Sequence, residues 1–311
     1  MILRKTGKKT NAGENKITDA EFFGNRLNVL NKTICPKGTA LSLRKHYEDP
    51  ITLAKLIKQG VLNEELAELI SVIIASERSF VMGGITGSGK STTLRALLNA
   101  NLEYQNKRVV VVEDTQELFL KVKNSVEAVT FAGNEKTSIT QTDLIIASLR
   151  MRPRIIVIGE IRGPEIYSAV QAAATGHMLI TSCHGETSTD IINRLVIGYQ
   201  QVMPNMTDAM VEKVVASSIS FVMIQDDNPL YGRKLSILDQ LVIDQTTGRC
   251  ALRPIARFNF ENKDWDFFNT ITKDTQYNML RRGIPKDRLD ALTRMMQEKI
   301  EITKSRGVEV L

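Results

Sequence analysis

The sequence lacks any long apolar run. No stretch approaches the roughly 20 uninterrupted apolar residues that a membrane-spanning helix needs. Lysine and asparagine occur within residues 1–20, where a secretory signal would be apolar. We therefore expect the chain to stay in the cytoplasm.

Cysteine is scarce. Cys35, Cys183 and Cys250 are widely spaced and form no CxxC pair. This spacing argues against both a disulfide framework and a zinc knuckle. We expect three reduced thiols with structural roles.

Aromatic residues make up 5% of the sequence, and no stretch combines them with clustered basic residues. Proteins that bind single-stranded nucleic acid by stacking depend on that combination. The net charge of +6, from 41 basic and 35 acidic residues, is a modest excess. Nucleic acid is therefore not the expected partner, although the positive excess keeps nucleic-acid binding as an alternative.

The chain does contain enough apolar residues, 42% of 311, for one substantial core with smaller flanking units. Apolar runs of strand length alternate with patterns of helical period, which predicts an α/β fold with a mostly parallel sheet. The expected strands are Ser79–Met82, Val109–Val112, Ile155–Ile158 and Met178–Thr181. The expected helices that follow these strands are Thr92–Leu98, Leu144–Leu149, Ile166–Ala174 and Ile191–Ile197.

We divide the chain into four segments. Residues 1–45 are interpreted as a short β-rich N-terminal domain with a flexible basic terminus, and 46–63 as a linker with a short helix. Residues 64–225 form the expected core, which a helix behind the N-cap residue Asn63 enters. Residues 226–311 are expected to add helices and a hairpin that turns at residues 246–248.

A complete Walker A signature follows the first core strand and opens a helix, which is the context that confirms such a match. Its glycines let backbone N–H groups surround phosphates at a helix N-terminus. Lys90 is expected to reach the terminal phosphates and Ser91 to bind Mg²⁺. The predicted nucleotide-binding residues are Gly84, Thr86, Gly87, Ser88, Gly89, Lys90, Ser91 and Thr92.

Acidic residues follow two other core strands, where a parallel sheet places its ligands. Glu160 follows the Ile155–Ile158 strand and is our first candidate for catalysis and, with Ser91, for the metal site. Glu113 and Glu117 follow the Val109–Val112 strand and come second. One carboxylate would hold the water shell of the metal, while another orients or deprotonates the attacking water.

Two histidines bracket the Met178–Thr181 strand. His177 precedes it and His184 follows it, so His184 is the one that we expect near a γ-phosphate. Either imidazole could instead cap backbone groups.

Four blocks together resemble the type II/IV secretion-system ATPases. Besides Walker A, residues 113–118 resemble the Asp box, 148–163 the Walker B region and 171–184 the His box. The order and spacing of all four are far more specific than any one motif. The resemblance implies a RecA-like P-loop core, a short N-terminal domain, and a hairpin with a helical tail. It also implies an ATP- and Mg²⁺-dependent ATPase that forms a ring of six subunits.

Both ends look most like the Flp (Tad) pilus-assembly branch, the CpaF/TadA type, with conjugation and type IV secretion ATPases as near relatives. Residues 24–29 and 41–45 carry the N-terminal likeness, and residues 255–258 and 283–285 the C-terminal one. The tetracysteine zinc insert of many type II secretion and pilus-extension ATPases is missing. Two departures are Arg154, where an Asp is common in the family, and the short N-terminal domain.

The resemblance therefore implies a motor that acts on inner-membrane platform proteins of a secretion or pilus machine, bound peripherally at the inner face of the membrane through its partners. The alternative is a conjugation or type IV secretion motor, or another DNA-translocating RecA-like ATPase. Three arginines, Arg44, Arg150 and Arg162, are candidates for stabilising charge in the transition state. Arg44 is favoured as an arginine finger because it lies at the end of the N-terminal segment.

Overall fold

The computed structural model describes residues 16–22, 25–45, 51–102, 106–131 and 137–310. The chain divides into two compact units, residues 1–50 and 51–311. The boundary expected after residue 45 lies near this division, while residues 51–63 and 226–311 belong to the second unit.

The first unit contains a small antiparallel sheet in the order β1-β2-β3. Its strands are β1 (Ile17–Phe22), β2 (Asn25–Leu30) and β3 (Ala40–Arg44). Leu27 pairs with Leu43 across β2 and β3, and the side chains of Leu27 and Val29 are buried. The β-rich character expected of this segment is confirmed.

The second unit is built on a nine-stranded sheet in the order β12-β11-β10-β9-β4-β8-β7-β5-β6. The strands from β9 to β6 in this order pair in parallel, and β10, β11 and β12 are antiparallel. The parallel strands are β4 (Phe80–Gly84), β5 (Val109–Glu113), β6 (Ser125–Val129), β7 (Ile155–Ile158), β8 (Met178–His184) and β9 (Phe221–Asn228). The antiparallel strands are β10 (Gly232–Ile243), β11 (Cys250–Asn259) and β12 (Asp264–Phe267).

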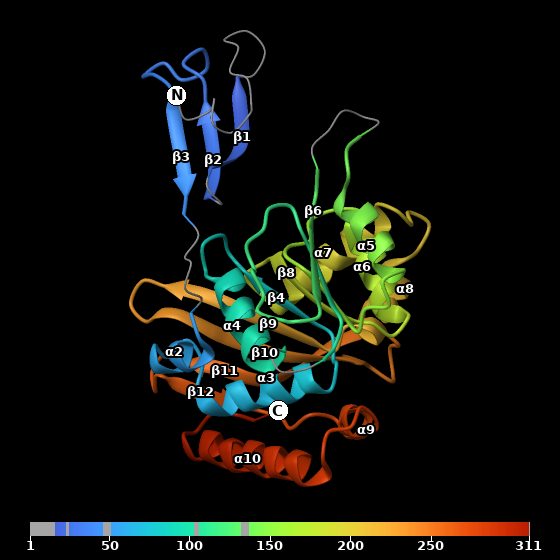
Figure 1. Cartoon of the computed structure of the whole chain (residues 1–311). Helices are drawn as coiled ribbons and strands as arrows, with labels where there is room; N and C mark the ends of the chain where they lie inside the picture. Colours follow the sequence, from blue (N-terminus) through green and yellow to red (C-terminus); the bar gives the residue numbers. More distant parts are fainter. Residues whose placement is uncertain (1–15, 23–24, 46–50, 103–105, 132–136, 311) are drawn as a thin grey trace. The chain divides into compact units, whose positions relative to one another are not determined.

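Helices cover both faces of this sheet (Figure 1). One face packs against α2 (Leu53–Lys58), α3 (Glu64–Ala75), α4 (Lys90–Leu102), α9 (Lys273–Arg281) and α10 (Lys286–Ser305). The other packs against α5 (Gln141–Leu149), α6 (Glu165–Ala174), α7 (Ser188–Gln200) and α8 (Asp208–Ser218). Alternate residues of one strand therefore enter different cores: Phe80 and Met82 enter one, and Val81 enters the other. The predicted α/β class with a mostly parallel sheet is confirmed.

Local sequence signals fix several of these elements. The side chain of Asn63 accepts a hydrogen bond of 2.9 Å from the Leu66 N–H at the start of α3. Thr140 and Thr187 each form a capping box, at α5 and α7. The expected hairpin is β10 and β11, and it extends the main sheet.

The antiparallel strands are held together partly by the single tryptophan of the chain. Trp265 on β12 is buried and donates its indole N–H to the Leu235 carbonyl of β10, at 2.7 Å. Its ring packs edge-on against Phe258 of β11, with centroids 4.8 Å apart. This contact ties the outermost strand to β10.

A charge cluster lies at the N-terminal ends of the parallel strands. Glu77, just before β4, is buried and accepts two hydrogen bonds from Arg154, at 3.1 and 2.6 Å. Lys107 and Arg282 contact the same carboxylate at 3.2 and 2.7 Å. Burial opposes ionisation of Glu77, but Arg154 and Lys107 outweigh it and hold the pKa of this carboxyl below its ordinary value. Arg154, which departs from the family pattern, therefore has a structural partner.

Among the described residues, no helix combines the length and apolar character needed to cross a membrane.

Candidate active site

The Walker A residues form the turn between β4 and α4. Gly84, Gly87 and Gly89 have φ angles of +148°, +84° and +98°, which favour glycine. A Cβ atom on Gly84 would lie 2.3 Å from the Gln225 carbonyl oxygen of β9, so backbone packing also requires glycine there. The backbone path of the loop between β4 and α4 therefore depends on these glycines.

Lys90, the first residue of α4, turns back over this loop. Its side chain is nearly buried, and Nζ donates hydrogen bonds to the carbonyls of Gly84 at 2.7 Å and Ile85 at 2.9 Å. Burial lowers the pKa of Lys90, and the nearby Glu160 opposes that shift. An ammonium group is thus fixed at the mouth of the loop, where it can pair with phosphate oxygens.

The carboxylate that contacts Ser91 is Glu117. Ser91 Oγ donates to Glu117 Oε2 at 3.2 Å. Glu113 lies behind it, buried, with one carboxylate oxygen accepting from the N–H groups of Glu117 and Leu118 at 3.2 Å. Burial raises the pKa of Glu113 to about 7. Glu117 therefore presents its carboxylate to the P-loop, and the Glu113 carboxylate holds the backbone at Glu117 and Leu118.

Glu160 lies beyond the end of β7, between Arg162 and His184. Its Oε2 accepts a hydrogen bond of 2.7 Å from Arg162. His184 Nε2, at the end of β8, is 2.7 Å from the other oxygen, an electrostatic contact rather than an aligned hydrogen bond. Burial of Glu160 opposes ionisation, but Arg162 and the positive charge of Lys90 hold its pKa below the ordinary value. Burial also lowers the pKa of His184, against the effect of Glu160, which favours the neutral imidazole.

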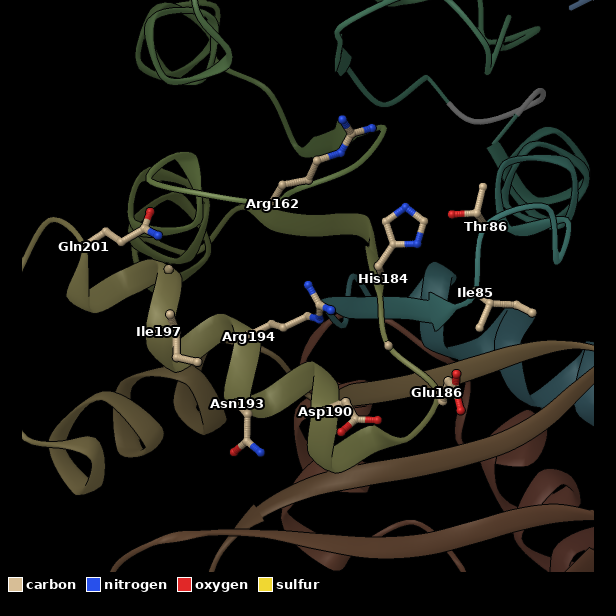
Figure 2. Close-up of a pocket in the computed structure, with 12 residues that line it drawn as sticks. Ile85, Thr86, Arg162, His184, Glu186, Asp190, Asn193, Arg194, Ile197 and Gln201 are labelled. Atoms are coloured by element: carbon tan, nitrogen blue, oxygen red, sulfur yellow. The ribbon is translucent and has the colours of Figure 1, made fainter.

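A pocket of about 760 Å³ opens beside these groups and the P-loop. Figure 2 shows Arg162 and His184 on one side of it with Thr86, and Arg194 extending from α7 toward His184. A second pocket of about 480 Å³ is lined by Glu160, Arg162 and Asp114. Arg162 lines both pockets, and Glu160 lines the second one.

Other predicted residues lie elsewhere. His177 precedes β8, at the opposite edge of the sheet from His184, and its Nδ1 lies 3.1 Å from the Ala172 carbonyl. Arg150 is the exposed C-cap residue of α5. Arg44 ends β3 in the first unit, so its proposed role stays a prediction.

Two cationic residues near the loop were not anticipated from the sequence. Arg194 lies on α7, ten positions after His184, and Arg233 on β10 donates to the Gly87 carbonyl at 3.2 Å. Arg194 could have been suspected from its position shortly after the His box, whose His184 lines the same pocket. In contrast, no local pattern connects Arg233 with a loop 146 residues away.

Comparison with known proteins identifies the family. Residues 21–226, more than half of the chain, match the family model described as Type II/IV secretion system protein. The chain belongs to this family, as the four sequence blocks indicated.

Curated relatives match part of the chain. It is 35% identical over 157 residues to a putative conjugal transfer protein of Mycobacterium tuberculosis, a match that covers 50% of this chain and 44% of the relative. It is 34% identical over 174 residues to an uncharacterized protein of Methanocaldococcus jannaschii, covering 55% and 31%. The chain therefore spans less than half of the length of these relatives.

Solved structures share the fold. The pilus retraction motor PilT with bound ADP matches with a TM-score of 0.53 and 21% identity, covering 94% of this chain and 74% of PilT. The Legionella pneumophila ATPase DotB matches with a TM-score of 0.53 and 20% identity, covering 96% and 75%. The second unit therefore has the RecA-like α/β architecture of secretion ATPases.

Proposed function

We propose that this protein is an ATP-hydrolysing motor of a secretion or pilus-assembly machine. The observation that supports this most directly is the gathering of Lys90, the Ser91–Glu117 pair and Glu160 at one edge of the sheet. Lys90 and Ser91 begin α4, and Glu117 and Glu160 lie in the segments that follow the buried strands β5 and β7, which favours a fixed geometry. Family membership supports the same conclusion.

In this proposal the loop binds the phosphates of ATP. The positive-φ glycines let backbone N–H groups turn toward an anion, and Lys90 exchanges its carbonyl partners for phosphate oxygens. Among the described residues, Ser88 Oγ is buried without a hydrogen-bond partner, which suits a polar ligand at the loop. The proposed binding residues are Gly84, Thr86, Gly87, Ser88, Gly89, Lys90, Ser91 and Thr92.

The Ser91 hydroxyl and the Glu117 carboxylate are hard oxygen donors that fit Mg²⁺. When bound, the ion would neutralise charge on the β- and γ-phosphates. Glu160 stays a candidate for the water shell of the metal, as the sequence suggested.

Glu160 is the proposed residue for the attacking water. Because Arg162 and Lys90 keep its carboxylate ionised, it can accept a hydrogen bond from water and orient it. His184, adjacent to Glu160, is the proposed γ-phosphate contact. Arg162 is the proposed charge stabiliser, with Arg44 and Arg150 as further candidates.

The finer proposal is a motor of the Flp (Tad) pilus type that assembles as a hexameric ring and acts on platform proteins at the inner face of the cell membrane. A conjugation or type IV secretion motor is equally consistent with the relatives, which include a putative conjugal transfer protein and a VirB11 protein of Brucella suis. DNA-stimulated ATPase activity would favour the conjugation alternative.

The decisive experiment on the activity itself is Lys90→Ala. We expect loss of ATP turnover and much weaker ATP binding in a folded protein, because the main cation at the phosphates is removed. Lys304→Ala, which removes an exposed lysine paired with Glu301, is the control and should turn over ATP normally. Unchanged turnover in Lys90→Ala would refute the ATPase proposal.

A further inference from the structure

The hairpin of β9 and β10 brings a side chain from the antiparallel part of the sheet to the P-loop. Figure 1 shows both strands in the sheet that also contains β4. β9 pairs in parallel with β4, so the hairpin continues past the strand end at which the P-loop begins. Arg233, the second residue of β10, donates a hydrogen bond of 3.2 Å to the Gly87 carbonyl.

The contact fixes one peptide plane of the loop. In a trans peptide the C=O and the following N–H point in opposite directions. With the Gly87 carbonyl held by Arg233, the Ser88 N–H points to the other side, where it now makes a long hydrogen bond of 3.3 Å to the Ile85 carbonyl. That long bond is weak enough to be exchanged for a stronger acceptor such as phosphate.

The aliphatic part of Arg233 also packs on the loop. A Cβ atom on Gly89 would lie 3.1 Å from Arg233 Cδ and 3.4 Å from Nε. Glycine at position 89 therefore serves two purposes, since it adopts a φ of +98° and leaves room for the arginine stem.

The rest of the hairpin holds Arg233 in this place. Arg233 is paired in register with Asp227 of β9, and the two side chains are 3.8 Å apart. The next two residues anchor the strand: Lys234 Nζ donates to the Gly60 carbonyl, and the Leu235 N–H to the Val61 carbonyl, both at 2.7 Å.

A small pocket of about 200 Å³ lies directly beside this contact. It is lined by Arg233 and Tyr231 of the hairpin region, by Gly89 and Thr92 of the nucleotide loop, and by residues around α2. A half-exposed arginine often only increases surface polarity. Here the guanidinium instead meets a backbone carbonyl of the phosphate loop and the wall of a pocket.

We propose that Arg233 is a positioning residue of the nucleotide site, which holds the Gly87–Ser88 peptide with its N–H turned toward the phosphates of the bound nucleotide. The inference rests on the proposed ATPase function. It assigns a binding role to the β9–β10 hairpin, outside the four motif blocks.

The test compares Arg233→Ala, Arg233→Lys and Arg249→Ala. Arg249 is the matched control, because its side chain is 53% exposed against 50% for Arg233 and pairs with Glu212 rather than with the loop. The measurements are steady-state ATP hydrolysis and equilibrium titration with a fluorescent ATP analogue in the presence of Mg²⁺. Thermal unfolding without nucleotide checks that each variant is folded.

For Arg233→Ala we expect the ATP KM and the analogue Kd to rise about 10-fold, the scale of one charged hydrogen bond, with kcat within about 3-fold of wild type. Arg233→Lys should recover most of the affinity, because an ammonium group can donate one hydrogen bond to the Gly87 carbonyl. Arg249→Ala should behave as wild type.

Three results would overturn the inference: a KM and Kd for Arg233→Ala within twofold of wild type, equal losses in the Ala and Lys variants, or a loss confined to kcat. Lys90→Ala separates this failure from failure of the ATPase proposal. If Lys90→Ala loses binding while Arg233→Ala does not, only the role of Arg233 is rejected. If Lys90→Ala also binds and hydrolyses ATP normally, the nucleotide site itself is rejected.

Discussion

An ionised glutamate lies beside cationic side chains at each end of the parallel strands, and the two glutamates differ in solvent access. Glu77, before β4, contacts Arg154, Lys107 and Arg282, and its side chain is 5% exposed. Glu160, after β7, contacts Arg162 and His184, and its side chain is 22% exposed beside open pockets. A glutamate paired with cationic side chains can thus stabilise the fold, as Glu77 does, or remain accessible to a ligand, as Glu160 does. The difference between the two is solvent access.

The comparison is tested most strongly by Glu77→Gln. Removing this charge leaves three cations close together, so we expect the free energy of unfolding to fall by about 3 kcal/mol. Denaturant unfolding measures the loss, and kcat per folded molecule should not change. Glu68→Gln, in an exposed pair with Arg288, is the control and should cost under about 0.5 kcal/mol. If both variants lose the same amount, Glu77 is not a structural centre.

Glu160→Gln is the matching change at the other edge. We expect ATP to bind while hydrolysis falls by about 100-fold or more, because the carboxylate that orients water is lost. The free energy of unfolding should change by less than about 1 kcal/mol. Single-turnover kinetics and analogue binding test this, with Glu212→Gln as a control away from the site. If Glu117→Gln loses more activity than Glu160→Gln, the roles of these two carboxylates are exchanged.

Glu113 adds a pH-dependent contrast at the nucleotide edge. Its pKa is raised by burial from an ordinary 4.5 to about 7, so the folded state holds the proton more tightly than the unfolded state. The resulting stabilisation is complete below about pH 4.5 and is lost as the pH rises through about 7. Relative to Glu113→Gln, the wild type should therefore lose about 2 kcal/mol of unfolding free energy between pH 5 and pH 8. Parallel pH profiles for the two proteins would contradict the assignment.

A matched pair of arginine variants gives the smallest expected effects. Arg162→Lys should lower kcat by about 10-fold with little change in stability, because the planar guanidinium would act on developing charge. Arg154→Lys should lower the free energy of unfolding by about 1 kcal/mol with unchanged kcat, because only its two-point contact with Glu77 is lost. The same kinetics on Arg44→Lys and Arg150→Lys test the other candidates, and wild-type kcat in Arg44→Lys would remove that residue from the site.

The sequence was most informative where local chemistry determines structure. Walker A, the strand-end carboxylates and the Asn63 cap depend on residues close together in the chain, and the predicted elements around them are confirmed. The helix α8 was missed although Thr207 caps it and Val211 and Val215 face the core at helical spacing. The edge strand β6 was missed because its residues are only partly buried and lack an apolar run.

Long-range partnerships could not be predicted from one sequence. Glu77 and Arg154 are 77 residues apart in the chain. They meet because Glu77 precedes β4, Arg154 precedes β7, and β8 alone separates these two strands in the sheet. The sequence also could not show that Glu113 turns inward while Glu117 faces Ser91, because both follow the same strand. That division of roles depends on the backbone path after β5.

The indole contact of Trp265 gives this molecule a natural optical probe. Because no other tryptophan exists in the chain, its tryptophan emission comes from one place. That place is hydrogen-bonded to Leu235, two residues beyond Arg233. Emission wavelength and lifetime can therefore follow the environment of the β10 strand during nucleotide addition, in the unmodified protein and without an attached dye.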